Sequence, residues 1–291
     1  MPAGLVLLLL LLVTTPALAA EPSTSGPADV EARNAVQWPH PLPFMADLAL
    51  KRGYELPLPF GVSGVFFYVE RDVEISNVRL GINGASLKDV NNFIDLGARS
   101  HSSGGVARFD AWLLPFLDVY GLVGYVTSTA DLKGTVTVPR PLRPGSLTFN
   151  LAGTAKVDGP TVGGGFTLVG GYRELFVLGD LNYSQSDLGF EDKFDALIGT
   201  VRVGWNGKVL DTPLQLWAGA TYWRTQTTAK STVDVPDVGR VTFEARQGPV
   251  HPLNAVIGTS FTLGRRWNPF VEYGFNGSDV QTVSAGLAFR F

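Results

Sequence analysis

The last eleven residues of the chain, QTVSAGLAFRF (Gln281–Phe291), alternate between apolar side chains and small or polar ones. In an extended strand successive side chains point to opposite faces, so residues two apart share a face. The apolar face carries Val283, Ala285, Leu287, Phe289 and Phe291. About ten such residues, tilted, are enough to cross a bilayer. The segment therefore predicts a membrane-spanning β-strand.

The opposite end of the sequence predicts a cleaved export signal over residues 1–20. An apolar run from Leu5 to Val13 is followed by Pro16 and then by Ala17-Leu18-Ala19, the small-residue pattern that precedes a cleavage site. The run is too short for a transmembrane helix. One departure from the usual signal peptide is that no Lys or Arg precedes the apolar run. The chain has no cysteine, which excludes a disulfide framework.

With an export signal at one end, the C-terminal segment resembles the closing strand of Gram-negative bacterial outer-membrane β-barrels. In that class an amphipathic strand with a terminal Phe or Trp is the assembly signal. The resemblance implies that Phe289 and Phe291 bind the barrel-assembly machinery, that the protein resides in the outer membrane, and that its apolar face contacts outer-membrane lipid. It covers the last strand only and points to no subfamily.

Composition and hydropathy agree with a barrel. Beyond residue 20 no run of eighteen apolar residues exists, so no helical span is available. Open sheet edges cannot face lipid, which leaves a closed barrel as the membrane-spanning solution. The formal net charge of -3 gives no electrostatic case for binding nucleic acid.

We divide the mature chain into a periplasmic segment, 21–56, and a barrel, 57–291. The first is rich in proline and holds one apolar piece, 44–50, for which two structures remain open. It forms either a short ordered cap at the periplasmic rim or a helix that enters the lumen as a plug. Pro57 and Pro59 end any helix before the barrel begins.

The barrel region alternates strands with short turns and long polar segments. Short turns are expected at Pro115, at Arg173-Glu174, at 206–208 and at 264–269, and long outer loops at 71–104, 130–160 and 226–250. Four short turns and two periplasmic termini give an antiparallel up-and-down barrel of ten strands. If 73–82 and 93–98 form a further membrane pair, the number rises to twelve.

The alternation also predicts which ionisable side chains face the lumen. Residues that alternate with the lipid-facing ones should point into the lumen. Eight ionisable side chains fall at such positions: Glu70, Arg108, Asp110, Asp118, Asp180, Arg202, Glu272 and Arg290. A narrow barrel cannot bury such groups unpaired without a desolvation cost, so a mixed-sign network that fills the interior is expected. The alternative is a constriction that selects small solutes by charge and width.

Catalysis needs a general base near neutral pH, and the chain has three histidines. His40 lies on the periplasmic side, His101 in the Ser- and Gly-rich stretch 100–104, and His251 where a loop meets a strand. No spaced cluster of His and carboxylates predicts a metal site, and no phosphate-binding glycine loop is found. We therefore expect no enzyme activity, no cofactor and no metal.

These patterns favour an outer-membrane barrel with a structural role or a passive role in the passage of small solutes. The alternative is a surface binding or adhesion protein that works through its long outer loops, with the barrel as an anchor. An outer-membrane hydrolase is the third hypothesis.

Overall fold

The computed structural model describes residues 37–139, 146–189, 192–225, 227–235, 239–264 and 266–291. The predicted signal peptide and the part of the following segment up to residue 36 lie outside these residues. Within the described residues, no helix is both long enough and apolar enough to cross a membrane.

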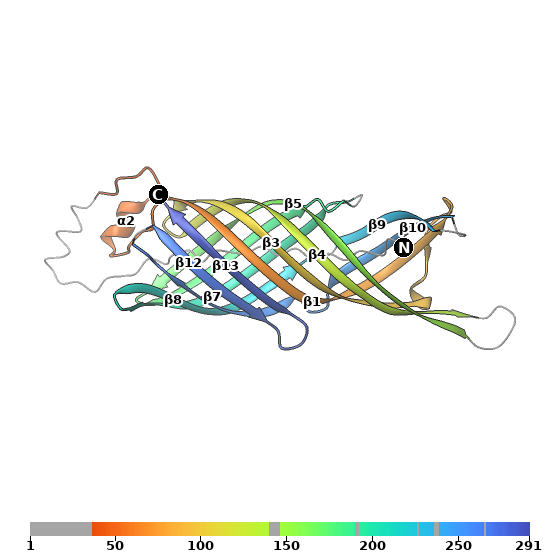
Figure 1. The fold of residues 1–291 in the computed structure, drawn as a ribbon. Coiled ribbons are helices and arrows are strands. Elements are labelled where there is room, and N and C mark those ends of the chain that lie inside the picture. Colours follow the sequence, from red (N-terminus) through yellow and green to blue (C-terminus); the bar gives the residue numbers. More distant parts are fainter. Residues whose placement is uncertain (1–36, 140–145, 190–191, 226, 236–238, 265) are drawn as a thin grey trace.

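Ten of the described strands form a closed antiparallel barrel (Figure 1). In order around the barrel they are β1 (Phe60–Ile82), β3 (Ile94–Leu114), β4 (Leu117–Pro139), β5 (Ser146–Tyr172), β6 (Leu175–Ser186), β7 (Phe194–Val209), β8 (Thr212–Arg224), β11 (Leu253–Phe261), β12 (Trp267–Phe275) and β13 (Gln281–Arg290). The barrel closes because β13 pairs with β1, from Gly61 opposite Arg290 to Glu70 opposite Gln281. The predicted ten-stranded barrel is confirmed.

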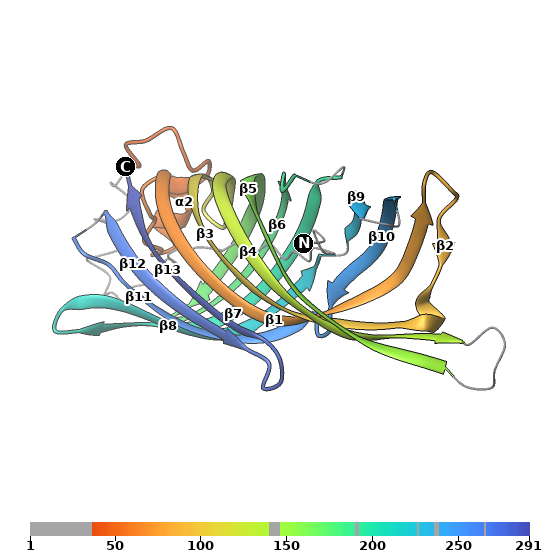
Figure 2. The same cartoon turned by 45° about the vertical axis from the view of Figure 1, so that its right-hand side comes forward.

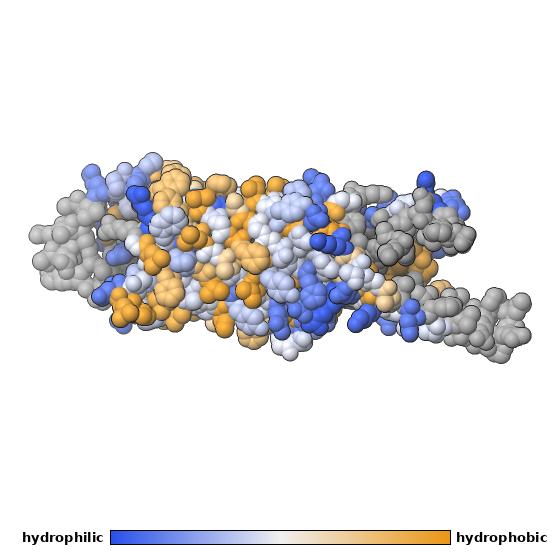
Figure 3. Space-filling model, in the orientation of Figure 1, coloured by the Kyte–Doolittle hydropathy of each residue, from blue (hydrophilic) through white to orange (hydrophobic). Residues whose placement is uncertain are grey.

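The outer surface of the barrel is apolar, as contact with lipid requires. Large apolar side chains remain exposed on every barrel strand, and Figure 3 shows apolar residues gathered over the barrel and hydrophilic ones beyond one end of it. Tyrosines stand toward that end: Tyr68, Tyr125, Tyr183 and Tyr222 are all exposed. An apolar band bordered by aromatic residues is the exterior of a transmembrane barrel.

Short turns join the strands at the end that holds the C-terminus, which is the periplasmic end of such a barrel. They lie at Pro115-Phe116, at 173–174, at Leu210-Asp211 and at 262–266. The expected turn at 206–208 is wrong, since β7 continues to Val209. Gly207 instead makes room for the indole of Trp205, which occupies the space that a Cβ would fill.

Residues 73–82 and 94–98 continue β1 and β3 beyond the membrane and add no membrane pair, so the favoured number of ten strands holds and the alternative of twelve is wrong. Segment 226–250, expected to be a loop, contains the hairpin β9 (Thr227–Val235) and β10 (Gly239–Pro249). Strand β10 pairs back onto β1, from Val73 opposite Pro249 to Ile82 opposite Val241, which the local sequence does not encode.

The outer end is therefore a curved sheet rather than a closed tube (Figure 2). Above the barrel the described strands run in the order β5, β4, β3, β1, β10, β9. The short strand β2 (Lys88–Asp89) and the 3-10 turn Asn91–Phe93 lie between β1 and β3. Strand β5 pairs with β6 only from Thr161 to Tyr172, whereas it pairs with β4 from Ser146 to Leu168.

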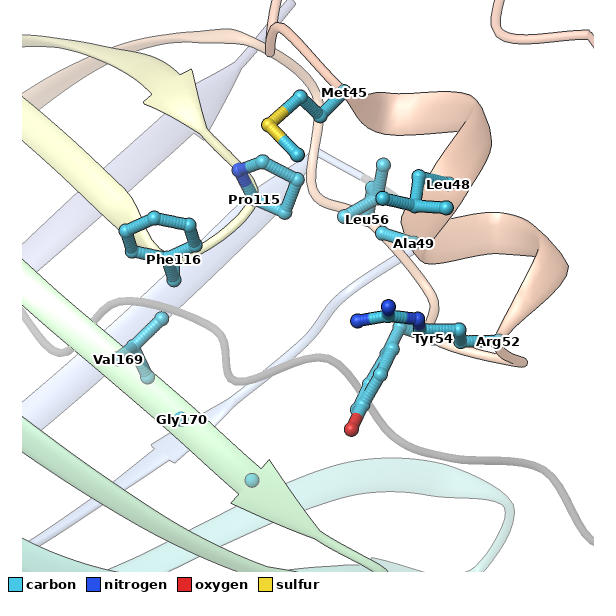
Figure 4. Close-up of a pocket in the computed structure, with 11 residues that line it drawn as sticks. Met45, Leu48, Ala49, Arg52, Tyr54, Leu56, Pro115, Phe116, Val169 and Gly170 are labelled. Carbon is cyan, nitrogen blue, oxygen red and sulfur yellow. The ribbon is translucent and has the colours of Figure 1, made fainter.

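The α-helix found in the described residues, α2 (Ala46–Lys51), lies at the periplasmic rim near the C-terminus (Figure 1). The chain just before it is tied to the barrel by the Phe44 amide, which donates to the Leu113 carbonyl at 2.9 Å. Figure 4 shows Met45 beside Pro115 of the β3–β4 turn. Both residues line a partly open cavity of about 270 Å³. These contacts place the helix against the rim turns.

Candidate functional site in the lumen

The lumen is filled by aromatic rings that lie against glycines of neighbouring strands. In each case a Cβ on the glycine would collide with the ring, so the absence of a side chain lets the ring lie flat on the wall. Five such pairs are Phe67 with Gly104, Tyr120 with Gly165, Phe176 with Gly204, Trp217 with Gly258, and Phe270 with Gly286. This packing explains part of the high glycine content, 34 residues.

A cluster of paired charges fills the periplasmic half of the lumen. Arg108 Nη2 lies 2.5 Å from Asp118 Oδ2, and Arg290 Nη2 donates to Asp110 Oδ2 at 2.9 Å. Arg108 also stacks on Tyr120, with Cζ 3.7 Å from the ring centroid. All four charged side chains are at least nine-tenths buried. They come from β3, β4 and β13, so the cluster ties the closing strand to the first part of the barrel.

The next layer contains two buried carboxylates with different partners. Asp180 accepts hydrogen bonds from Tyr120 Oη at 3.0 Å and from Thr167 Oγ1 at 2.7 Å. Glu272 receives two bonds from Arg202, at 2.7 and 2.9 Å. The Trp217 indole nitrogen adds a third, at 2.6 Å. Together these side chains cross the lumen from β5 and β6 to β12.

Seven of the eight predicted lumen residues thus point inward, and the structure gathers them into two groups, one around Arg108 and the other formed by Arg202 and Glu272. Glu70 does not, and its predicted position is wrong. It lies on the outer face of β1, where Arg99 Nε donates to it at 2.7 Å and Tyr68 stands beside it. The inner face of β1 carries Phe67, Val69 and Arg71, all almost fully buried.

Above the charged layers the wall of the lumen carries both apolar and polar buried side chains. Strands β1, β3 and β4 contribute Val65, Phe67, Val106, Leu122 and Val126. Strands β6 and β11 contribute Asn182, Ser184, Ser186 and Asn254. Among the described residues, Asn182 Oδ1, the Ser184 and Ser186 hydroxyls and both amide atoms of Asn254 are buried without a hydrogen-bond partner. Polar groups of this kind are satisfied by water or by a polar ligand.

The short loop 276–280 joins β12 to β13 at the outer end of these strands. Asp279 Oδ1 accepts hydrogen bonds from His251 Nδ1 at 2.8 Å, and from Asn276 and Ser278 at 2.7 Å each. Burial alone would raise the pKa of Asp279, but the bonds from Ser278, Asn276 and His251 outweigh it and hold that pKa below its usual value. Val280 is buried beside it. These hydrogen bonds and the burial of Val280 hold the loop in one conformation.

The structure separates the residues that could have formed a hydrolase site. His101 is on the outer face of β3, close to Tyr68 at 3.2 Å, whereas Ser100 and Ser102 face inward and bond to Ser128. His40 packs edge-on against Trp38 at the periplasmic rim. Within the described part of the chain, no three His, Asp or Glu side chains gather in a metal-binding arrangement.

Comparison with known proteins gives structural likeness only. No family model and no curated protein matches the sequence. The outer membrane protein OprG of Pseudomonas aeruginosa is 14% identical, with 81% of this chain and 98% of that chain covered and a TM-score of 0.43. The β domain of the Bordetella autotransporter BrkA is 15% identical, covers 80% and 100%, and has a TM-score of 0.38. The toluene transporter TbuX of Ralstonia pickettii is 11% identical, covers 81% and 90%, and has a TM-score of 0.35.

Likeness at this level carries no information on what this chain binds or transports. The fold itself is unambiguous, because a closed barrel with an apolar exterior, short turns at one end and an aromatic-ended closing strand is a membrane-spanning structure. The protein has the architecture of a Gram-negative outer-membrane β-barrel.

Proposed function

We propose that the barrel is a narrow passive route for small polar solutes, closed in the conformation described. The observation that carries this proposal is the column of unpartnered polar atoms on Asn182, Ser184, Ser186 and Asn254. A buried polar atom without a partner costs about 1–3 kcal/mol. A wall that keeps several of them along the lumen is suited to water and to small molecules with hydroxyl or amide groups.

The charged layers below this column act as the constriction. Arg108 with Asp118, and Arg202 with Glu272, place both signs of charge across the lumen; the first three side chains are almost fully buried and that of Glu272 is 12% exposed. Passage requires one of these side chains to swing aside. Because both signs are present and paired, the layers favour neutral or zwitterionic polar solutes over simple ions.

Removing one layer tests the proposal. We expect the double variant Arg202→Ser, Glu272→Ser to raise single-channel conductance in planar bilayers and sugar uptake in liposome swelling. Replacing both partners avoids leaving one buried charge alone. The matched control is Arg99→Ser, Glu70→Ser, which removes an ion pair of the same type from the outer face. A folded lumen variant with no conductance and no uptake above empty liposomes would refute the route.

A second function, binding at the cell surface, is supported by the extended outer sheet. The outer part of β5, residues 146–160, pairs with β4 but with no other described strand, so it presents a free edge. Free edges accept an added strand from a partner. Replacing residues 134–151 by an Asn-Gly turn would join Lys133 to Ala152, which already pair. Surface binding should then be lost while heat-dependent gel mobility, the sign of a folded barrel, stays unchanged.

A further inference from the structure

Four arginines are buried in the described part of the barrel, and three of them hold a carboxylate. Arg108, Arg202 and Arg290 each lie within 2.9 Å of one. Arg71 is fully buried, yet no carboxylate of the described residues lies within ion-pair distance of it. A guanidinium out of water without a counter-ion is strongly unfavourable. The position therefore calls for a negative charge from elsewhere.

The surroundings of Arg71 offer hydrogen-bond donors and few acceptors. Arg71 Nη2 donates to Thr225 Oγ1 at 3.1 Å, and its Cζ lies 4.8 Å from the Trp223 ring centroid. Arg71 Nε and Nη1 and the indole nitrogen of Trp223 are buried without any acceptor. Three N–H groups in one cluster that lack an acceptor define a site for a ligand that only accepts, which is the chemistry of an oxyanion.

The cluster sits at the outer mouth and borders a cavity. Arg71 follows Glu70, the last residue of β1 that pairs with β13. Trp223 and Thr225, the two residues that hold Arg71, also line a partly open cavity of about 150 Å³. Arg224 and Arg246 lie at this cavity and are exposed. Glu74 lines it as well, so the cavity carries a net positive charge before Arg71 is added.

We propose that Arg71, Trp223 and Thr225 form a binding site for a small oxyanion, the carboxylate or phosphate group of a solute that reaches the outer mouth. Arg71 supplies the charge and two N–H donors, and Trp223 supplies a third donor and holds the guanidinium plane. The exposed arginines draw the anion toward the cavity. The inference rests on the proposed route and deepens it, because the site would take the carboxylate or phosphate group of the zwitterionic solutes that the charged layers favour; binding itself does not depend on conduction.

Asp279 is a carboxylate of the protein that could serve as the counter-ion of Arg71 in place of an external anion. Its charge acts on Arg71, and its Oδ2 is also buried without a partner. The two side chains do not meet, because Oδ1 of Asp279 is held by His251, Asn276 and Ser278. If loop 276–280 moved so that Asp279 paired with Arg71, no external anion would be needed.

The test measures anion binding to the folded, detergent-solubilised protein. Acetate and inorganic phosphate are titrated against chloride at constant ionic strength, and the thermal unfolding midpoint is followed, because a ligand that binds the folded state raises it. We expect at least one of the two oxyanions to raise the midpoint of the wild type, with affinity at least about tenfold weaker in Arg71→Gln. The matched control Arg99→Gln, an exposed arginine on the outer face, should bind as the wild type does.

Two further variants keep the test decisive. If Arg71→Gln does not fold, Thr225→Val and Trp223→Phe each remove one contact and leave the charge, and each should weaken the anion effect. Equal effects of acetate, phosphate and chloride on the wild type, or an unchanged effect in Arg71→Gln, would overturn the site. An anion effect that arises only in Asp279→Asn would also overturn it, because Asp279 would then be the counter-ion. Binding without conductance would refute the route and leave the site intact.

Discussion

The seam where the barrel closes depends on one glycine, which makes room for an ion pair. Gly61 of β1 is opposite Arg290 on one side and opposite Asp110 on the other. A Cβ on Gly61 would lie 2.6 Å from both carboxylate oxygens of Asp110. In Gly61→Ala this carboxylate must move, although the 2.9 Å bond from Arg290 holds it in place.

The expected change in unfolding free energy is the difference between the weakened Arg290–Asp110 interaction and the gain from alanine in place of glycine in a strand. A hydrogen bond to a charged group contributes about 1.5–3 kcal/mol, whereas separating the buried pair completely would cost about 3–5 kcal/mol. Alanine in a strand recovers about 0.5–1 kcal/mol relative to glycine. Since Asp110 can shift without leaving the lumen, we expect the unfolding free energy of Gly61→Ala to fall by about 1–2 kcal/mol.

The measurement is urea unfolding of the protein folded in lipid, followed by tryptophan fluorescence and by gel mobility without heating. Gly64→Ala is the matched control, because Gly64 lies on the same strand and a Cβ there would meet no atom within 4 Å. Its stability should stay the same or rise. In an Asp110→Asn background the cost of Gly61→Ala should shrink, as a double-mutant cycle reports. Equal unfolding free energies for Gly61→Ala and Gly64→Ala would refute the reasoning.

Three more predictions concern separate parts of the chain. Phe291→Ser should lower the amount of heat-modifiable barrel in outer membranes, because it removes the exposed terminal ring of the closing strand; unchanged assembly would remove Phe291 from the insertion signal. The pKa of Asp279 is lowered in the folded state, so its contribution to stability is complete above its unfolded pKa of about 3.9 and is lost as pH falls through the folded value. The difference in unfolding midpoint between wild type and Asp279→Asn should thus be constant from about pH 7 to 5 and vanish in stronger acid, and a difference that is already lost between about pH 7 and 5 would contradict this. Gly258→Ala should displace the Trp217 indole and shift its fluorescence, which an unaltered emission spectrum would disprove.

The sequence predicts the barrel well because lipid imposes a strict alternation. Where one face is apolar and the other charged, as around Arg108 on β3, the inward and outward residues follow directly from the pattern. Strand β1 has no such contrast, since Phe66, Phe67, Tyr68 and Val69 put bulky side chains on both faces. Its lumen side is the apolar wall of the interior, so apolar character does not identify the lipid face, and Glu70 was expected on the wrong side.

The same limit applies to the site. Pairing of Arg108 with Asp118 could be expected, because the two residues flank one short turn. The absence of a carboxylate partner for Arg71 could not be expected from the sequence, because it depends on which strands meet at the outer mouth. There β13 ends and β10 takes its place beside β1. At this level the inner side chain of β1, Arg71, contacts Trp223 and Thr225 instead of the ion pairs deeper in the lumen. Arg71 is thereby left buried without a carboxylate, against two residues that line a cavity at the outer mouth, and this change of neighbour is the structural cause of the oxyanion site that we propose.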